Sequence, residues 1–170
     1  MKMRITALVA AILALSAASA MATDTSFNAA VNVTTPIQAT VVQNSMSVNL
    51  TRLNPAVTDF AAGDAAWLSS TPVRIDFVSN PGQAIGVSGL YSSLTLNNGS
   101  NTATLNSTCR WTETPPLTSA TDGTACGTSI TPVGYSFSVY LFPTSATLAA
   151  GAAGQGAFSA NNGHLTMEYM

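Results

Sequence analysis

The sequence predicts an all-β fold, a β-sandwich of the immunoglobulin type, and three observations carry this prediction. Apolar and polar residues alternate with a period of two in several separate segments, which is the pattern of half-buried strands. Short turn motifs lie between these segments. No stretch after residue 22 shows a long helical period with capping residues. Short strands with regular turns are typical of a sandwich.

The expected strands are distributed over the whole chain. The clearest alternation covers residues 27–34, 46–51, 73–77, 135–141 and 165–169. Less regular candidates cover residues 85–90, 94–96 and 102–105. Turns are expected at residues 80–82, 97–100 and 161–163, which combine Asn with Gly. Within the connection at 54–71, residues 61–68 are a candidate for one helical turn.

The first residues predict export. A short basic start with Lys2 and Arg4 is followed by an almost entirely apolar run over residues 5–15 and then by small residues. This order is that of a Sec-type signal peptide, and cleavage after Ala20 or after Ala22 fits it, with the second preferred. The apolar run is shorter than the ~20 residues of a membrane-spanning helix, so export is expected rather than anchoring.

Removal of the signal leaves an acidic chain with few cations. Arg52, Arg74 and Arg110 remain, while all seven acidic residues stay, so three cations against seven anions give a net charge of −4. Three scattered cations do not neutralise a phosphate backbone, and the sequence therefore argues against nucleic-acid binding. An anionic lipid surface repels the chain for the same reason.

The overall composition is that of a folded protein with an unusually uncharged surface. Only 7% of residues are charged and 46% are hydrophobic, whereas disorder requires low hydrophobicity and high net charge. Ordinary soluble domains carry about a quarter charged residues. So few charges favour a protein that packs against copies of itself.

Two cysteines, Cys109 and Cys126, are expected to form a disulfide because the chain is exported and their number is even. The residues between them are expected to form an irregular loop, whose closure contributes about 3 kcal/mol. A metal site would need more Cys or His at close spacing. A reactive thiol would need a basic neighbour, and Arg110 is adjacent to Cys109, but the expected disulfide leaves no cysteine for such chemistry.

The sequence nominates no catalytic site and no cofactor. His164 is the one histidine, and at the start of the last expected strand it is interpreted as a solvated or capping residue. Its sequence neighbours include no Cys or Asp that would complete a triad. No phosphate-binding glycine motif follows an expected strand. We therefore expect neither enzyme activity nor a bound metal.

Two tryptophans support an alternative function. Trp67 and Trp111 lie in expected loops, where an aromatic side chain can either stack on a sugar or pack the loop against the sandwich. The first possibility corresponds to a monomeric secreted carbohydrate-binding or adhesive module.

Both ends of the expected mature chain are alternating strands, and this layout resembles that of the pilins of bacterial chaperone–usher fibres. In that family the immunoglobulin-like sandwich lacks its last strand, and the N-terminal extension of the next subunit fills the gap. The resemblance implies a donor-strand extension at 23–34 and a sandwich domain at 35–170. The residues that would enter the next subunit are Phe27, Ala29, Val31 and Val33.

The resemblance also implies partners and a location. The C-terminal strand would engage a periplasmic chaperone through Leu165, Met167 and Tyr169, with the terminal carboxylate of Met170 held as well. An outer-membrane usher would assemble copies of the chain into a surface fimbrium that supports adhesion or biofilm formation, with a host or surface glycan as a further possible partner. Many pilins place their disulfide near the first core strand, so the late cysteines indicate a divergent branch.

One alternative for residues 27–34 stays open, namely that this strand folds back into its own domain. Deletion of residues 23–34 separates the two cases. A pilin would keep its chaperone-bound fold and lose polymerisation, whereas a self-contained sandwich would lose one of its own strands and be strongly destabilised.

Overall fold

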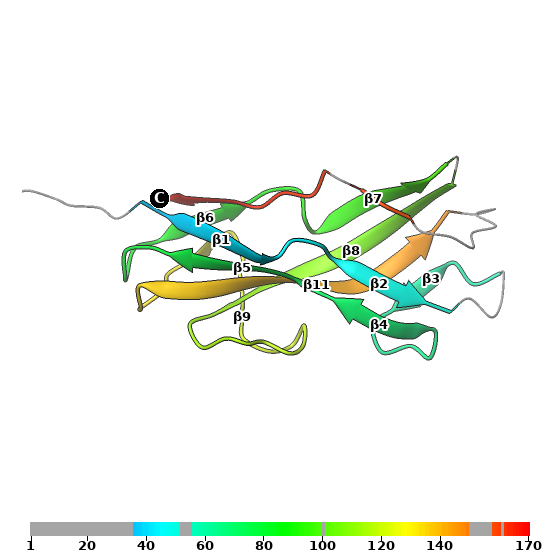
Figure 1. The fold of residues 1–170 in the computed structure, drawn as a ribbon, viewed down its shortest axis with the longest axis horizontal. Helices are drawn as coiled ribbons and strands as arrows, with labels where there is room; N and C mark the ends of the chain where they lie inside the picture. The colour runs from blue at the N-terminus through cyan, green and yellow to red at the C-terminus, as the bar shows by residue number, and fades with distance from the viewer. Residues whose placement is uncertain (1–35, 52–55, 100, 150–157, 161) are drawn as a thin grey trace, which may run out of the picture. The chain divides into compact units, whose positions relative to one another are not determined.

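The computed structural model describes residues 36–51, 56–99, 101–149, 158–160 and 162–170 (Figure 1). Within these residues the chain forms strands, turns and irregular segments and no helix, so the all-β prediction is confirmed. Accordingly, the described part contains no helix that is long and apolar enough to cross a membrane. The expected signal peptide and the expected strand at 27–34 lie outside the described residues.

Twelve strands follow one another along the described chain. They are β1 (Gln38–Gln43), β2 (Ser47–Leu50), β3 (Asp59–Ala61), β4 (Trp67–Thr71), β5 (Val73–Val78), β6 (Ile85–Ser88), β7 (Ser93–Asn98), β8 (Asn101–Thr112), β9 (Thr124–Ala125), β10 (Ser129–Ile130), β11 (Ser136–Leu148) and β12 (Thr166–Tyr169). Every expected strand that falls within the described residues is present, as β2, β5, β6, β7, β8, β11 and β12.

The largest sheet has the strand order β1-β5-β11-β8-β7, and all of its pairs are antiparallel. β3 pairs with β11 beyond the end of β5, and β9 pairs with the end of β8. The register puts Gln38, Val78 and Ser136 side by side in one row across β1, β5 and β11. The start of β1 therefore lies at the same end of the sheet as the segment that leads into β11.

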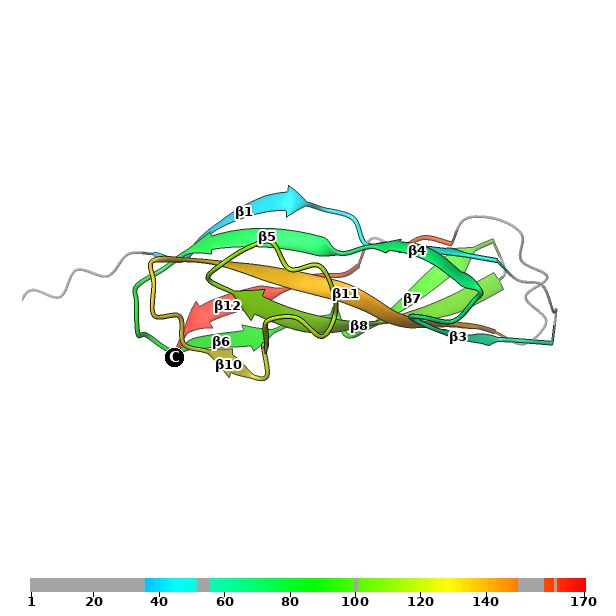
Figure 2. The same cartoon turned by 90° about the horizontal axis from the view of Figure 1, so that it is seen from below.

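A smaller sheet packs against the large one. Its order is β10-β6-β12, and Figure 2 shows these three strands together below β5 and β11. β2 and β4 form a separate two-stranded sheet. Pro72 separates β4 from β5, as expected for a residue that has no backbone N–H to donate to a ladder.

Two clusters of buried side chains form the core. The first lies between the two main sheets and is made of Phe77, Ile85, Val87, Cys109, Cys126, Ile130, Phe137, Val139 and Leu141. The second contains Phe60, Ala103 and Leu148, with Trp67 and Leu96 packed against them. The period-two pattern of β8, in which every second residue from Ala103 to Cys109 is buried, contributes to both clusters.

β8 and β11 are longer than the sequence pattern indicates. The alternation predicts that β11 ends at Leu141, but the strand continues to Leu148 through Pro143. The pairing of β11 with β8 shifts register between Pro143 and Ser145. A proline is tolerated at such a bulge because its missing N–H removes no regular ladder bond.

The helical turn expected at residues 61–68 is wrong. Ala61 ends β3 opposite Ser145 of β11, a turn follows, and Trp67 begins β4. The backbone N–H of Ala62 donates to the Thr144 carbonyl at 2.8 Å. Pairing with β11 therefore overrides the helix propensity of the local alanines, which is a weak preference.

Candidate functional site

The last strand, β12, lies at one margin of its sheet. The order β10-β6-β12 ends there, and the backbone N–H of His164 donates to the Leu90 carbonyl at 2.9 Å just before the ladder with β6 begins. Backbone groups of an antiparallel strand point alternately to either side. The N–H and C=O of Leu165 and Met167 therefore face away from β6, a side on which none of the described strands pairs with β12.

The side chains of β12 alternate as the sequence predicted. Leu165, Met167 and Tyr169 are half-buried against the first core cluster, while the two residues between them are exposed. The Tyr169 hydroxyl accepts a hydrogen bond from the backbone N–H of Asn80 at 2.8 Å. This bond ties the end of the last strand to the turn that follows β5.

β1 borders the same core from the large sheet. Its register places Ala39 opposite Phe77 and Val41 opposite Ile75, and directly opposite residues share one face of a sheet. Phe77 is 5% exposed and belongs to the first core cluster, so Ala39 and Val41 lie on the inner face. Val41 is nevertheless 56% exposed, and Val73 is only half-buried.

These residues define an incompletely covered side of the core, called here the open edge. Figure 1 shows β1 and the C-terminal strand along the same margin of the sandwich. They belong to different sheets, which Figure 2 shows as separate layers. Inward-facing apolar side chains that keep contact with water retain an unfavourable hydration free energy of about 25 cal/mol per Å². The open edge consists of Ala39, Val41, Val73, Ile75, Leu165 and Met167.

Sequence reasoning missed one half of this edge. The segment Ile37, Ala39 and Val41 alternates with Gln38 and Thr40, and that period-two signal is sufficient to predict β1. The expected strand at 27–34 has the stronger pattern, and it lies outside the described part of the chain.

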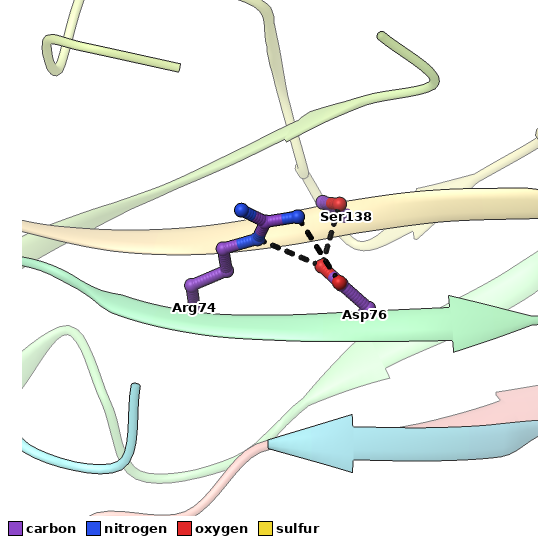
Figure 3. A network of polar contacts seen from close by, with 3 residues as sticks. All are labelled: Arg74, Asp76 and Ser138. Atoms are coloured by element: carbon purple, nitrogen blue, oxygen red, sulfur yellow. Dashed lines mark hydrogen bonds and ion pairs between the residues drawn. The ribbon is translucent and has the colours of Figure 1, made fainter. Parts of the chain in front are cut away.

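The outer face of the large sheet carries a polar network instead (Figure 3). The Arg74 guanidinium donates to both carboxylate oxygens of Asp76, from Nε at 2.9 Å and from Nη2 at 3.0 Å, and the Ser138 hydroxyl donates to Asp76 at 2.7 Å. Burial alone would raise the pKa of Asp76, but the hydrogen bonds from Arg74 and Ser138 and the Arg74 charge hold it below its ordinary value. The same pairing raises the pKa of Arg74. Arg74 also lies 5.7 Å from the ring centre of Tyr140.

The predicted disulfide is confirmed between Cys109 and Cys126, whose Cα atoms are 5.5 Å apart. Both sulfurs belong to the first core cluster, and neither of these cysteines is free. The loop that the bond closes is fastened further, since Arg110 Nε donates to the Ala120 carbonyl at 2.7 Å. Hydrogen bonds from the side chains of Thr118 and Ser119 and from their backbone lower the pKa of Asp122. This part of the molecule is a structural brace.

Neither tryptophan lies in a loop, which corrects the prediction. Trp67 begins β4 and packs against the second core cluster. Trp111 lies in β8, and its ring meets that of Phe137 edge-on at 6.2 Å. Both rings are half-buried against core residues, because each strand turns its indole inward. Neither ring is presented as an exposed stacking platform.

The described residues offer little for catalysis or metal binding. His164 is exposed, and its Nδ1 lies 3.3 Å from the Asn162 carbonyl oxygen. A cavity of about 270 Å³ beside β3 is lined by Asp59 and Asp64 among others, yet no group of three or more potential metal ligands occurs in the described part. Asp64 instead accepts the backbone N–H of Ala61 at 2.6 Å.

Comparison with known proteins adds no family assignment: no family model, curated protein or solved structure matches this chain.

Proposed function

We propose that this protein is a subunit of a surface fibre, assembled when a strand from another copy occupies the open edge. The observation that carries the proposal is the strand order. In an immunoglobulin constant-type sandwich one sheet has the order A-B-E-D and the other C-F-G. Here β1-β5-β11-β8 corresponds to A-B-E-D and β6-β12 to C-F in the same chain order. No described strand takes the position of G.

The position of G is the place where a further strand would be stabilised most. It lies next to the outward backbone groups of Leu165 and Met167 and between them and the inner face of β1. A strand placed there satisfies backbone groups and covers apolar side chains at once, which is the physical basis of strand addition. Covering the core of one subunit and binding the next would then be a single event.

The N-terminal segment of a second copy has the pattern that this position requires. Its apolar residues Phe27, Ala29, Val31 and Val33 alternate with Asn28, Ala30, Asn32 and Thr34, so one face suits the core and the other suits water. Before assembly, a periplasmic chaperone would pair with β12 and cover the same open edge. At the outer-membrane usher, the chaperone would be released from the subunit. Residues 1–22 would direct export into that compartment.

A pair of matched substitutions tests the proposal. V31D places a carboxylate on the apolar face of the segment, and N32D places one on its polar face. We expect V31D to abolish the heat-sensitive polymer ladder in protein sheared from the producing cells, because a buried unpaired charge opposes strand insertion. N32D should retain the ladder. Equal polymer from both variants would contradict the proposal.

The V31D chain supplies a second test, since it would lack a functional donor and keep its acceptor edge. A synthetic peptide of residues 23–34 should raise the thermal unfolding midpoint of the V31D chain in a concentration-dependent way. The same peptide with the V31D change should have no such effect. A chain with a complete sandwich would respond to neither peptide.

A further inference from the structure

Two large apolar side chains stand out from one end of the sandwich. Val133 is 80% exposed and Tyr135 is 68% exposed. They flank Gly134 in the connection between β10 and β11. We call these two residues the exit-end patch. Isolated exposed apolar residues are common, so exposure alone does not indicate a function.

The backbone beneath the patch is held firmly. The N–H groups of Val133 and Gly134 both donate to Glu113 Oε1. The Tyr135 carbonyl accepts the N–H of Ser79 at 2.9 Å. A contact surface whose backbone is already ordered loses little conformational entropy when a partner binds.

The patch lies at the end of the sandwich where the described chain begins, at Pro36. Gln38, Val78 and Ser136 form one row across three strands, and Tyr135 immediately precedes that row. Pro36 is two residues before Gln38, so at most about 7 Å of chain separates them. Pro36 and the start of β1 therefore lie at the same end at which Val133 and Tyr135 are exposed.

The length of the connection fixes how far away an acceptor copy can be. Between Val33, the last apolar residue of the proposed donor strand, and Pro36 there are three residue steps, or at most about 10 Å of extended chain. If residues 27–33 lie in the open edge of a second copy, that copy must sit directly against the exit end. No partner at larger distance satisfies this covalent limit.

We propose that the exit-end patch, Val133 with Tyr135, docks onto the second copy of this chain that accepts the N-terminal strand. This inference rests on the proposed function and adds to it a second contact between subunits, outside the acceptor position. Aromatic residues are enriched at the energetically important centres of protein interfaces. The sparse charge of the chain leaves little like-charge repulsion to oppose such a contact.

The test combines a patch variant with a matched control. V133D/Y135D introduces two carboxylates at the patch. The control, L68D, introduces one carboxylate on β4. Leu68 is similarly exposed, at 64%, and lies ten residues before Val78, the β5 residue of the row next to the patch. Polymer is measured as the heat-sensitive ladder in protein sheared from the cells. Acceptor function is measured separately, as binding of the peptide of residues 23–34 to V31D chains with and without the patch substitutions.

We expect V133D/Y135D to reduce polymer by about tenfold or more, the effect of losing one interface hot spot, while peptide binding stays within about twofold and L68D has no effect. Wild-type polymer levels in V133D/Y135D would overturn the inference and leave the proposed function standing. An equal loss of peptide binding, or an equal loss in L68D, would also overturn it. If the wild-type chain forms no ladder and the V31D chain binds no peptide, both proposals fail.

Discussion

Gly89 stands directly against the backbone of His164, the residue that leads into the last strand. A Cβ atom at position 89 would collide with the His164 carbonyl oxygen, and Gly89 has a φ of +132°, a conformation that L side chains rarely adopt. This close approach lets β12 reach its place beside β6. Because glycine has no Cβ atom, Gly89 allows the backbone that leads into β12 to approach, and it thereby helps to position the open edge.

The first prediction follows from that contact. G89A should lower the free energy of unfolding by about 2 kcal/mol or more, because the substitution adds both backbone strain and a clash with backbone atoms. Gly63 provides the control, since it also has a positive φ of +98° but no atom within 4 Å of the position that a Cβ would take. Urea unfolding of both variants measures the difference. A loss in G63A equal to that in G89A would show that strain alone accounts for the effect.

The second prediction concerns the brace at the end of β8. Replacing both Cys109 and Cys126 by alanine should lower the free energy of unfolding by about 3 kcal/mol, because the bond restricts the unfolded chain and both residues lie in the core. Wild-type protein unfolded in urea with a reducing agent should show a comparable loss. An unchanged urea midpoint in the double variant would contradict the structural role given to this bond.

The third prediction is a loss of stability in acid that depends on Asp76. Its pKa is lower in the folded chain than the ordinary value of about 3.9, so its ionised form stabilises the fold. That contribution is complete above the unfolded pKa and is lost as the pH falls through the lower, folded pKa. Unfolding free energy measured from pH 7 to pH 2 should therefore be level for this group down to about pH 5 and fall below about pH 4.

Substitution of Asp76 measures how much this carboxylate contributes to the pH dependence of the free energy of unfolding. D76N should cost about 1 kcal/mol at pH 7, since the ion pair with Arg74 is partly exposed and screened, and it should flatten the acid limb of the curve. S138A removes only one hydrogen bond to the carboxylate and should have a smaller effect. An acid limb of unchanged slope in D76N would assign the pH dependence to other groups.

The fourth prediction tests the inner face of the last strand. M167D places a charge among the half-buried residues of the open edge, whereas T166D places one on the exposed side of the same strand. We expect M167D to reduce binding of the peptide of residues 23–34 to the V31D chain by about tenfold or more, and T166D to leave it unchanged. Circular dichroism of both variants serves as the check that they are folded. Equal binding by both would place the acceptor position elsewhere.

Local patterns predict those strands that have water on one face. The alternation in Val73–Val78 and in Thr166–Tyr169 marks β5 and β12 because each has one face toward the core and one toward solvent. The disulfide follows from the number of cysteines and the expected export. The strand order, with no described strand in the position of G, depends on contacts between distant segments, and no local pattern specifies it.

Other errors have physical causes that a single sequence conceals. No period-two pattern marks Trp67, because Ala66 and Leu68 on either side of it are apolar, yet it lies in β4. Trp111 lies in β8, which extends well beyond the residues 102–105 that the alternation predicts. Pro143 suggests an end to β11, whereas a bulge accommodates it. The exit-end patch carries no sequence signal, since the exposure of Val133 and Tyr135 depends on the turn that Glu113 holds from another part of the chain.

The most direct test of the central claim is a denaturing gel of protein sheared from the producing cells, run with and without boiling, alongside electron microscopy of the same fraction. Strand exchange between copies predicts a ladder of polymers that collapses to one band on boiling, together with thin filaments. A single monomer band before boiling and no filaments, from cells that secrete the protein well, would contradict the account.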